Sequence, residues 1–348
     1  MRYLLYAEQN YSYAILRPLQ QAILQRGDEA VWFLAGNEIR HDYLHADERK
    51  FNSIKEVVAW HPDVVLVPGN HVPKFIPGIK VGIFHGFNVA KSTRPDDRGH
   101  FNIRGCFDLY CTQGPNTTAG FEQRAAKYGF FGVRQTGWSA IDPLFQNLPS
   151  AVPDDGKKTI LLCSTFTKEL SCAPLLVDTI RQLRDSGKWR WLVQFHPKMP
   201  QEVVDAYKAL QNDNLTFVET DNVIPLLQQA DLMLCDTSSV MTMFLLQRKP
   251  VVTFRNQTRG NTEHLLNVTE ADALEQAIDY ALSCPDELMA KIDAFIADTH
   301  PYQDGKSSER VLAAIDDFKQ HQYGKLKSKP ANLIRSFKER KKLGYWGF

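Results

Sequence analysis

Short apolar runs alternate with stretches of helical spacing along the first half of the chain. Each run is about four or five residues long, which is typical of buried strands in a parallel sheet. The predicted strands are Tyr3–Tyr6, Ala30–Leu34, Val64–Val67, Val81–Phe84, Leu109–Cys111 and Val133–Thr136, with helical spacing at Tyr13–Gln25, Ile54–Trp60 and Thr117–Tyr128. This alternation predicts an α/β fold with helices on both faces of the sheet.

The alternation stops at Leu148–Lys158, which is rich in Pro, Asp and Gly and predicts a linker. It then restarts. The predicted strands of the second half are Thr159–Cys163, Trp191–Phe195, Leu215–Val218, Leu232–Cys235 and Val251–Phe254, and the predicted helices are Ala173–Asp185, Gln201–Gln211, Val223–Gln229, Ser239–Gln247 and Ala271–Cys284. We therefore expect two Rossmann-like domains, 1–150 and 151–315, followed by a basic helical tail, 316–348. One large doubly wound sheet is the alternative.

Composition places the chain among soluble globular proteins. It has 348 residues, of which 43% are hydrophobic and 23% charged. The net charge is +1, but the segment from Lys325 onward holds eight Lys or Arg and one Glu, a net of +7, so the remainder carries −6. An acidic body binds nucleic acid poorly, and we expect no nucleic-acid partner.

Neither a leader nor a metal site is expected. The N-terminal sequence turns polar after five residues, and no apolar stretch approaches the ~20 residues of a spanning helix, so a cytoplasmic protein is predicted. The six cysteines form no CxxC pair, and Cys163 and Cys235 lie in apolar runs that predict buried structural thiols. Without a DxD triplet or a cluster of metal ligands, no metal or other cofactor is predicted.

The polar cluster Asp236-Thr237-Ser238-Ser239 directly follows a predicted strand and precedes an apolar helix. Unpaired backbone N–H groups and the helix dipole favour anions at a helix start, and three small hydroxyl side chains add hydrogen-bond donors. The cluster therefore predicts a diphosphate site. Simple N-capping is the alternative, because Asp, Thr and Ser all cap helices well.

Two histidines follow predicted strands, one in each half. His196 follows the second-half strand ending at Phe195, and His85, with Gly86 after it, follows the strand ending at Phe84. Ligands of such sheets lie beyond the carboxyl ends of the strands, so the two side chains are predicted to face each other across a cleft. Histidine can act as a general base or contact a phosphate near neutral pH, and Gly86 would let the backbone approach a ligand. A hydrogen-bonded loop histidine is the alternative in each case.

The motifs together resemble the CDP-glycerol glycerophosphotransferases, which build teichoic-acid-type glycerol phosphate polymers of the cell envelope. The resemblance rests on FHG at 84–86, TG-x-x-x-ID at 136–142, CST at 163–165, FHP at 195–197, CDTSS at 235–239 and DGKSSER at 304–310. It implies a GT-B fold, with two Rossmann-like domains facing a central cleft and C-terminal helices packing back. It also implies a transferase that moves glycerol phosphate from CDP-glycerol to a hydroxyl of a cell-surface glycan or lipid-linked acceptor and releases CMP.

The resemblance also implies roles for individual residues. His85 would be the general base for the acceptor hydroxyl, and His196 would contact the donor diphosphate or stabilise the leaving CMP. The donor-binding residues would be Gly86, Ser164, Thr165, Asp236, Thr237, Ser238, Ser239, Arg255, Arg259 and Lys306. The chain departs from the family pattern at Phe84, where a Trp is usual, and at Thr167 and Lys168, where an Arg is common.

Other functions remain open at this stage. The segments 255–264 and 302–310 also resemble the nucleotide-sugar 2-epimerases, although FHGFN lacks the acidic residue that usually follows His-Gly in those enzymes. A GT-B glycosyltransferase that uses a nucleotide sugar, and a GT-B relic that only binds, are further alternatives.

The basic tail has two compatible interpretations. Leu333, Ile334, Phe337 and Lys341 fall at helical spacing, and the surrounding basic and aromatic residues are Arg335, Lys338, Arg340, Lys342, Tyr345, Trp346 and Phe348. Basic residues with aromatics suit peripheral contact with the inner face of a membrane. A helix packed back across the first domain, with its charged face in water, is the alternative.

Overall fold

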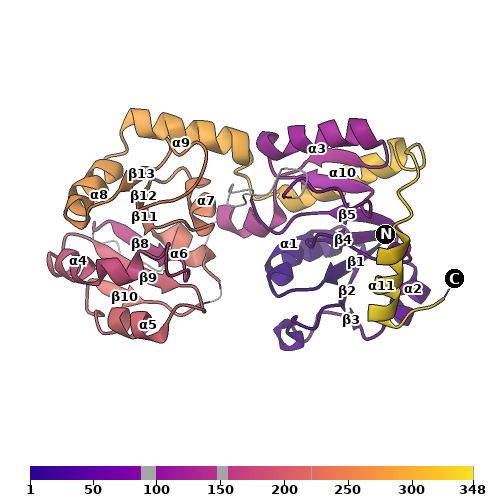
Figure 1. Cartoon of the computed structure of the whole chain (residues 1–348), viewed down its shortest axis with the longest axis horizontal. Coiled ribbons are helices and arrows are strands. Elements are labelled where there is room, and N and C mark those ends of the chain that lie inside the picture. The colour runs from indigo at the N-terminus through magenta and orange to yellow at the C-terminus, as the bar shows by residue number, and fades with distance from the viewer. Residues whose placement is uncertain (88–98, 147–155, 221, 348) are drawn as a thin grey trace. The chain divides into compact units, whose positions relative to one another are not determined.

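Two parallel β-sheets organise the chain in the computed structural model, which describes residues 1–87, 99–146, 156–220 and 222–347 (Figure 1). The chain divides into two units, each with one sheet. Of the described residues, unit 1 comprises 1–87, 99–143 and 298–347, and unit 2 comprises 144–146, 156–220 and 222–297. Unit 1 thus includes the segment 298–315, which the sequence analysis placed with the second domain. Most of the predicted linker, 147–155, lies outside the described residues.

Unit 1 has a seven-stranded parallel sheet in the order β3-β2-β1-β4-β5-β6-β7. Its strands are β1 (Arg2–Ala7), β2 (Glu29–Leu34), β3 (Lys50–Phe51), β4 (Val64–Val67), β5 (Ile79–Gly82), β6 (Leu109–Thr112) and β7 (Gly132–Gln135). Its first three helices are α1 (Tyr11–Gln25), α2 (Ile54–Trp60) and α3 (Pro115–Tyr128). The strand order reverses between β1 and β4, as in the Rossmann fold.

Unit 2 has a six-stranded parallel sheet in the order β10-β9-β8-β11-β12-β13. Its strands are β8 (Thr159–Ser164), β9 (Arg190–Phe195), β10 (Leu215–Phe217), β11 (Leu232–Cys235), β12 (Val251–Phe254) and β13 (Leu266–Val268). Its helices are α4 (Ala173–Asp185), α5 (Gln201–Lys208), α6 (Ile224–Gln229), α7 (Val240–Leu245), α8 (Leu274–Leu282) and α9 (Asp286–Thr299), the last of which ends in unit 1. The order again reverses beside the first strand, here between β8 and β11. The expected pair of Rossmann-like sheets is confirmed.

The apolar runs form strands because both faces of each sheet are covered. Every residue of β4, β8, β11 and β12 is buried, as continuous apolar runs predict for parallel strands. The structural role predicted for Cys163 and Cys235 is confirmed, since both lie buried in these strands. Burial raises the pKa of the Cys163 thiol to about 12, so this thiol stays protonated at neutral pH.

One strand differs from the prediction. The run Val81–Phe84 predicted a strand up to Phe84, whereas β5 ends at Gly82. Phe84 has a φ of 64°, in the left-handed region that breaks a strand. Its ring packs edge-on against Phe121 at 5.0 Å and tilted against Tyr110 at 6.0 Å, and this core packing turns the backbone out of the sheet.

Two C-terminal helices pack back onto unit 1, where the yellow end of the chain in Figure 1 lies among indigo and purple elements. They are α10 (Ser307–His321) and α11 (Leu333–Leu343). Helix α10 packs against α1 and β6. Its start is held by Asp142, whose carboxylate accepts hydrogen bonds from the Ser307 and Ser308 backbone N–H groups at 2.8 Å and from Ser308 Oγ at 2.6 Å. Asp142 thereby ties TG-x-x-x-ID to DGKSSER.

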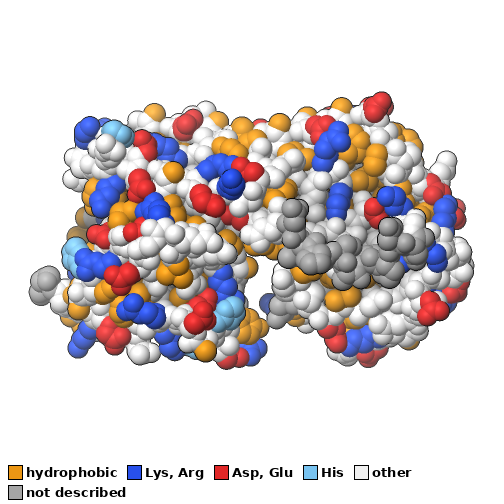
Figure 2. Space-filling model, turned by 180° about the vertical axis from the view of Figure 1, so that it is seen from behind, with side chains coloured by type: hydrophobic (Ala, Val, Ile, Leu, Met, Phe, Trp, Pro, Cys, Tyr) orange, Lys and Arg blue, Asp and Glu red, His pale blue; other side chains and the backbone are white. Residues whose placement is uncertain are grey.

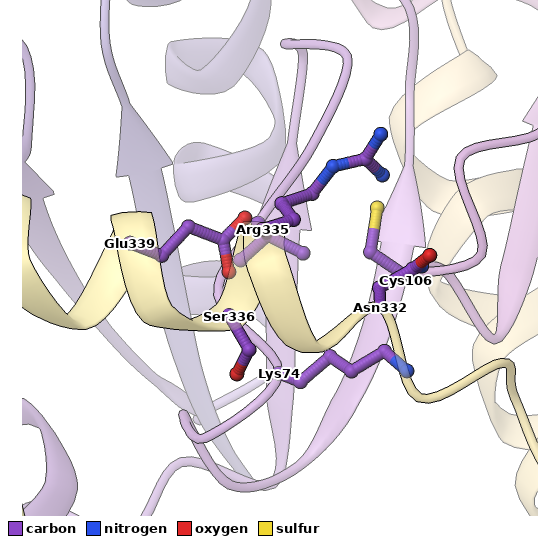
Figure 3. Close-up of a pocket in the computed structure, with 7 residues that line it drawn as sticks. Lys74, Cys106, Asn332, Arg335, Ser336 and Glu339 are labelled. Carbon is purple, nitrogen blue, oxygen red and sulfur yellow. The ribbon is translucent and has the colours of Figure 1, made fainter.

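Helix α11 attaches to unit 1 through polar residues. Figure 3 shows Arg335, Ser336 and Glu339 of this helix with Lys74 and Cys106 around a small pocket. The Glu339 side chain is buried, and its Oε1 atom has no hydrogen-bond partner among the described residues. Burial raises the pKa of Glu339 to about 7, against the opposing effect of Arg335, and the negative charge of Glu8 raises it further. The pocket therefore holds a carboxylate that is poorly solvated when ionised.

Glu339→Gln should make the folded protein more thermostable above pH 7 and have a smaller effect at pH 5. Because the pKa of Glu339 is higher in the folded state than in the unfolded chain, the folded state binds this proton more tightly, and stability falls as pH rises from about 4.5 to 7. The glutamine removes that loss, for an expected gain on the order of 1 kcal/mol, or about 2–4 °C in Tm. Thermal denaturation of both proteins at pH 5 and at pH 8 measures the effect.

Glu309→Gln is the matched control, because Glu309 is exposed on α10, and it should change Tm little at either pH. An equal gain for Glu339→Gln at pH 5 and pH 8 would contradict the assignment, since a packing effect has no such pH dependence.

Candidate active site

The candidate donor residues of unit 2 gather at adjacent strand ends. Strands β8 and β11 are hydrogen-bonded neighbours, and the strand order reverses between them. Ser164 and Thr165 end β8 or follow it, and the cluster 236–239 follows β11. In open α/β sheets, ligands bind in the crevice at such a reversal. The structure therefore brings these two predicted segments together at the position where a nucleotide would bind.

Asp236 fastens the two strand ends to each other. It is fully buried, and its carboxylate accepts hydrogen bonds from Ser164 Oγ at 2.6 Å, from the Thr165 N–H at 3.0 Å and from the Cys172 N–H at 3.0 Å. Its backbone carbonyl accepts a fourth, from Asn256 Nδ2 at 3.1 Å. The Ser164 hydroxyl belongs to the same hydrogen-bond network, since its Oγ also accepts a hydrogen bond from the Ala173 N–H at 3.2 Å. Asp236 and Ser164 thus position the loops.

The three hydroxyl residues after Asp236 divide into one framework residue and two accessible ones. Thr237 is buried, and its Oγ1 accepts from the Gln257 N–H at 2.9 Å, which fixes the loop after β12. Ser239 is exposed and precedes α7 without a side-chain capping bond, while Ser238 is half-buried and accepts a long bond of 3.4 Å from the Val240 N–H. With the half-buried Thr165 opposite, Ser238 and Ser239 are the hydroxyls available to a ligand. N-capping accounts for little of the cluster.

His196 follows β9 on the same rim. The Lys198 N–H donates to His196 Nδ1 at 3.0 Å, so the neutral imidazole carries its proton on Nε2. Partial burial lowers the pKa of His196, and the positive charge of Lys198 lowers it further. The side chain is therefore a neutral N–H donor at physiological pH, which suits a hydrogen bond to a phosphate oxygen.

Phe166 is a residue of this rim that the sequence analysis did not single out. It follows β8, and the centroid of its ring lies 4.5 Å from that of the His196 ring. Lys198 Nζ lies 5.8 Å from the centroid of the Phe166 ring. The phenyl group is also exposed, which is unusual for Phe. Its position directly after Ser164-Thr165 was the available signal, but a Phe at a strand end is usually a core residue.

The three cations that were predicted at the donor site lie in different places. Arg255 has a φ of 49°, and its Nε donates to the Thr269 carbonyl at 3.0 Å, which holds the side chain along the end of β13. Arg259 is exposed in the loop after β12. Lys306 is exposed before α10 and belongs to unit 1, so it is not part of the unit 2 group.

His85 of unit 1 projects from a strained turn. It follows Phe84, whose left-handed conformation costs on the order of 1–3 kcal/mol in a non-glycine residue. The turn is held by Trp138 Nε1, which donates to the Phe84 carbonyl at 3.3 Å, and by Gln113 Nε2, which donates to the Gly86 carbonyl at 2.9 Å. Backbone strain that is fixed by several contacts is typical of functional sites.

The imidazole of His85 is exposed and oriented by two contacts. Its Nδ1 lies 3.4 Å from the Pro68 carbonyl, and its ring stacks on Tyr11 at 5.3 Å. If Nδ1 donates to that carbonyl, Nε2 is the basic nitrogen and can accept a proton. At Gly86, a Cβ would meet no atom within 4 Å, so the backbone is open on that side.

The described residues include neither a metal-binding cluster nor a membrane-spanning helix. They contain no group of three or more His, Cys, Asp or Glu that could hold a metal ion. Within those ranges, no helix combines the length and the apolar character that crossing a membrane would require. Over the face shown in Figure 2, acidic and basic side chains are interspersed among the described residues of both units.

Residues 154–317 match the family described as CDP-Glycerol:Poly(glycerophosphate) glycerophosphotransferase. Over this segment, the chain is similar to that family. The segment includes five features discussed above, namely β8, Phe166, His196, the cluster after β11 and DGKSSER. The resemblance drawn from the motifs is confirmed.

Solved structures with a similar fold include both transferases and epimerases. The wall teichoic acid polymerase TagF has a TM-score of 0.63 at 16% identity, covering 92% of this chain and 89% of that one. A Listeria monocytogenes protein described as a UDP-N-acetylglucosamine 2-epimerase has 0.64 at 15%, covering 92% and 97%. S. aureus MnaA with UDP has 0.60 at 17%, also covering 92% and 97%. At these identities the matches establish the GT-B fold.

No sequence among curated proteins matches this chain. The family similarity therefore covers the segment 154–317, whereas the fold assignment comes from the nearly full-length structural matches.

Proposed function

We propose that this chain is a glycerophosphotransferase that moves glycerol phosphate from CDP-glycerol to a hydroxyl of a cell-surface glycan or lipid-linked acceptor and releases CMP. The observation that carries the proposal is the family match over 154–317, which spans every donor-side residue of unit 2 described above. The wall teichoic acid polymerase TagF, whose fold this chain shares, has been soaked with CDPG as a histidine variant.

The reaction follows from simple chemistry at the phosphorus. The acceptor oxygen forms a bond to the phosphorus that bears glycerol, the bond from that phosphorus to the bridging oxygen breaks, and CMP leaves with the electron pair. Phosphoryl transfer mainly requires positioning, neutralisation of charge and a base for the hydroxyl. His85 Nε2 takes the proton of the acceptor hydroxyl in this proposal.

On the donor side, hydrogen-bond donors replace a metal ion in binding the diphosphate. Thr165, Ser238 and Ser239 offer hydroxyls at the strand ends, and the neutral His196 offers Nε2–H. Asp236 keeps the β8 and β11 ends in register through the bonds described above. Arg255, Arg259 and Lys306 are proposed to contribute positive charge, although Arg255 must first leave the Thr269 carbonyl.

A panel of nucleotides tests the choice of donor. CDP-glycerol at about 100 times its Kd should stabilise the protein by about 2.7 kcal/mol, or about 5–10 °C in Tm, and CMP should act in the same direction. UDP and UDP-sugars should shift Tm much less. Stabilisation by UDP-N-acetylglucosamine without any response to CDP-glycerol would favour a 2-epimerase or glycosyltransferase, which the shared GT-B fold also allows.

The proposed place of action is the cytoplasm, at the inner face of the membrane, where a lipid-linked acceptor would be found. Peripheral attachment through the basic segment from Lys325 onward is part of this proposal, because that segment carries a net +7 on an otherwise acidic chain.

A further inference from the structure

Apart from Leu343, which packs against the core of unit 1, helix α11 has polar residues on its inward side and its large apolar residues on its outward side. The inward side is held by hydrogen bonds to the Arg104 carbonyl, from Asn332 Nδ2 at 3.0 Å and from Arg335 Nη1 at 2.7 Å. Near its other end, Lys342 Nζ forms a 2.8 Å ion pair with Glu8. These contacts fix the rotation of the helix about its own axis. A surface helix of a soluble protein normally has the opposite orientation.

The residues that face outward are large and apolar. Leu333 and Ile334 are each 77% exposed and Phe337 is 58% exposed, values that are unusual for three such residues on one helical turn. Trp346, just after the helix, is 53% exposed and packs edge-on against Phe337 with ring centroids 5.4 Å apart. These four residues form a continuous patch, which we call the α11 apolar face.

The helix ends are fixed, so the patch is a rigid feature of unit 1. Asn332 and Gly344, on either side of α11, both adopt left-handed backbone conformations, with φ of 49° and 63°. Tyr345, which follows Gly344, stacks on Phe75 with ring centroids 4.9 Å apart. The guanidinium group of Arg340 lies 4.8 Å from the centroid of the Phe75 ring. The α11 apolar face therefore cannot turn inward without breaking these contacts.

Exposed lysines lie beside the patch and indicate what covers it. Lys338 and Lys341 are exposed and lie one helical turn after Ile334 and Phe337, respectively. Lys325 and Lys327, which precede the helix, are exposed as well. Apolar and aromatic side chains beside exposed lysines match an anionic bilayer, because the side chains can enter the acyl region while the ammonium groups contact lipid phosphates. A protein partner of acidic character would match the charge, but it would not require four large apolar side chains exposed together on one side of a helix.

We propose that the α11 apolar face binds anionic phospholipid bilayers, with Leu333, Ile334, Phe337 and Trp346 inserted and the exposed lysines at the headgroups. The bilayer would then lie against unit 1, the unit that carries His85. Bilayer binding assigns residues to the peripheral attachment proposed above and stands independently of the proposed catalytic activity, whereas its use to reach a lipid-linked acceptor rests on that activity.

Vesicle flotation of the full-length protein tests the proposal. Wild-type protein should float with vesicles of phosphatidylcholine and phosphatidylglycerol, bind vesicles of phosphatidylcholine alone at least about tenfold more weakly, and lose binding to the anionic vesicles as salt rises. The double variant Ile334→Ser with Phe337→Ser should lose at least about tenfold in partitioning. Leu175→Ser is the matched control, because Leu175 is 55% exposed on α4 of unit 2, and it should float like wild type.

Four results would overturn the proposal, three of them from flotation. The wild-type protein could fail to float, it could float equally with both vesicle types, or the double variant could float with the anionic vesicles as well as wild type does. Sedimentation showing a wild-type dimer that the double variant turns into a monomer would identify a second copy as the occupant, and would also overturn it.

The nucleotide response separates this proposal from the catalytic one. The double variant should keep the full Tm shift with CDP-glycerol, since both substitutions lie in unit 1, whereas the donor strand ends belong to unit 2. A wild-type protein that floats but shows no such shift would contradict the proposed function alone.

Discussion

His85→Ala should lower the rate of CMP release from CDP-glycerol in the presence of acceptor by about 10²–10⁴-fold, the range of general-base catalysis. The imidazole is presented by the strained turn at Phe84 and oriented by Pro68 and Tyr11. Removing it leaves the acceptor hydroxyl without a base. The Tm shift with CDP-glycerol should persist, because the donor hydroxyls belong to unit 2.

His321→Ala is the control for that experiment. His321 is exposed at the end of α10 in unit 1, 3.9 Å from Asp317, and its loss should leave CMP release unchanged. Near-normal turnover of His85→Ala would contradict the assignment of the base. Loss of both turnover and the donor-induced Tm shift would instead indicate that His85 contributes to donor binding.

Asp236→Ala should destabilise the protein by at least about 3 kcal/mol and abolish the Tm shift with CDP-glycerol. The substitution leaves the Ser164 hydroxyl and the Thr165 and Cys172 N–H groups buried without their acceptor, at about 1–3 kcal/mol each. The ends of β8 and β11 then lose their shared anchor, and the hydroxyls of Thr165 and Ser238 lose their relative positions. Thermal denaturation and calorimetric titration with CDP-glycerol, below the lowered Tm, measure the two effects separately.

Asp231→Asn is the matched control at the other end of β11. Its carboxylate pairs with Lys158 at 2.9 Å and accepts from the Thr159 N–H at 2.8 Å. Because the ion pair is exposed, its loss should cost no more than about 1 kcal/mol, and the Kd for CDP-glycerol should not change. A donor Kd for Asp236→Ala equal to that of wild type would show that Asp236 stabilises the fold without positioning the donor loops.

The sheets were predictable from the sequence because buried parallel strands require continuous apolar runs. All the core strands of both units lie at or within about two residues of their predicted positions. The edge strands β3 and β13 were not predicted, because a strand of two or three residues, only one of which is buried in the two strands together, gives no such signal. The helices α9 and α10 were also missed, although α10 closes unit 1 through a contact with Asp142 that spans nearly half of the chain.

The candidate site was predictable by position but not by role. The rule that ligands bind at the carboxyl ends of strands pointed to Ser164, His196 and the cluster after Cys235. It could not separate the buried Asp236, which holds loops together, from the exposed Ser239, because burial depends on which strand lies alongside. Phe166 was missed for the same reason, because a sequence does not distinguish an exposed aromatic residue from a core one.

Helical spacing alone could not decide which side of the tail helix packs on the protein, and two interpretations stayed open. Leu333, Ile334 and Phe337 share one side of α11, as their spacing predicted, and a helix packed back on a domain normally buries such a side. In the structure, Asn332, Arg335 and Glu339 face the protein instead, because unit 1 offers the Arg104 carbonyl and the charged residues around Glu8 there.

The central claim is transfer of glycerol phosphate, and it is tested most directly by product analysis. Purified protein is incubated with CDP-glycerol and a hydroxyl-bearing glycan or lipid-linked acceptor, and in parallel with UDP-N-acetylglucosamine, and the products are separated by chromatography. We predict CMP in the first reaction, with glycerol phosphate joined to the acceptor in equal amount, and an unchanged nucleotide sugar in the second. Epimerised sugar in the second reaction, with no CMP in the first, would contradict the account.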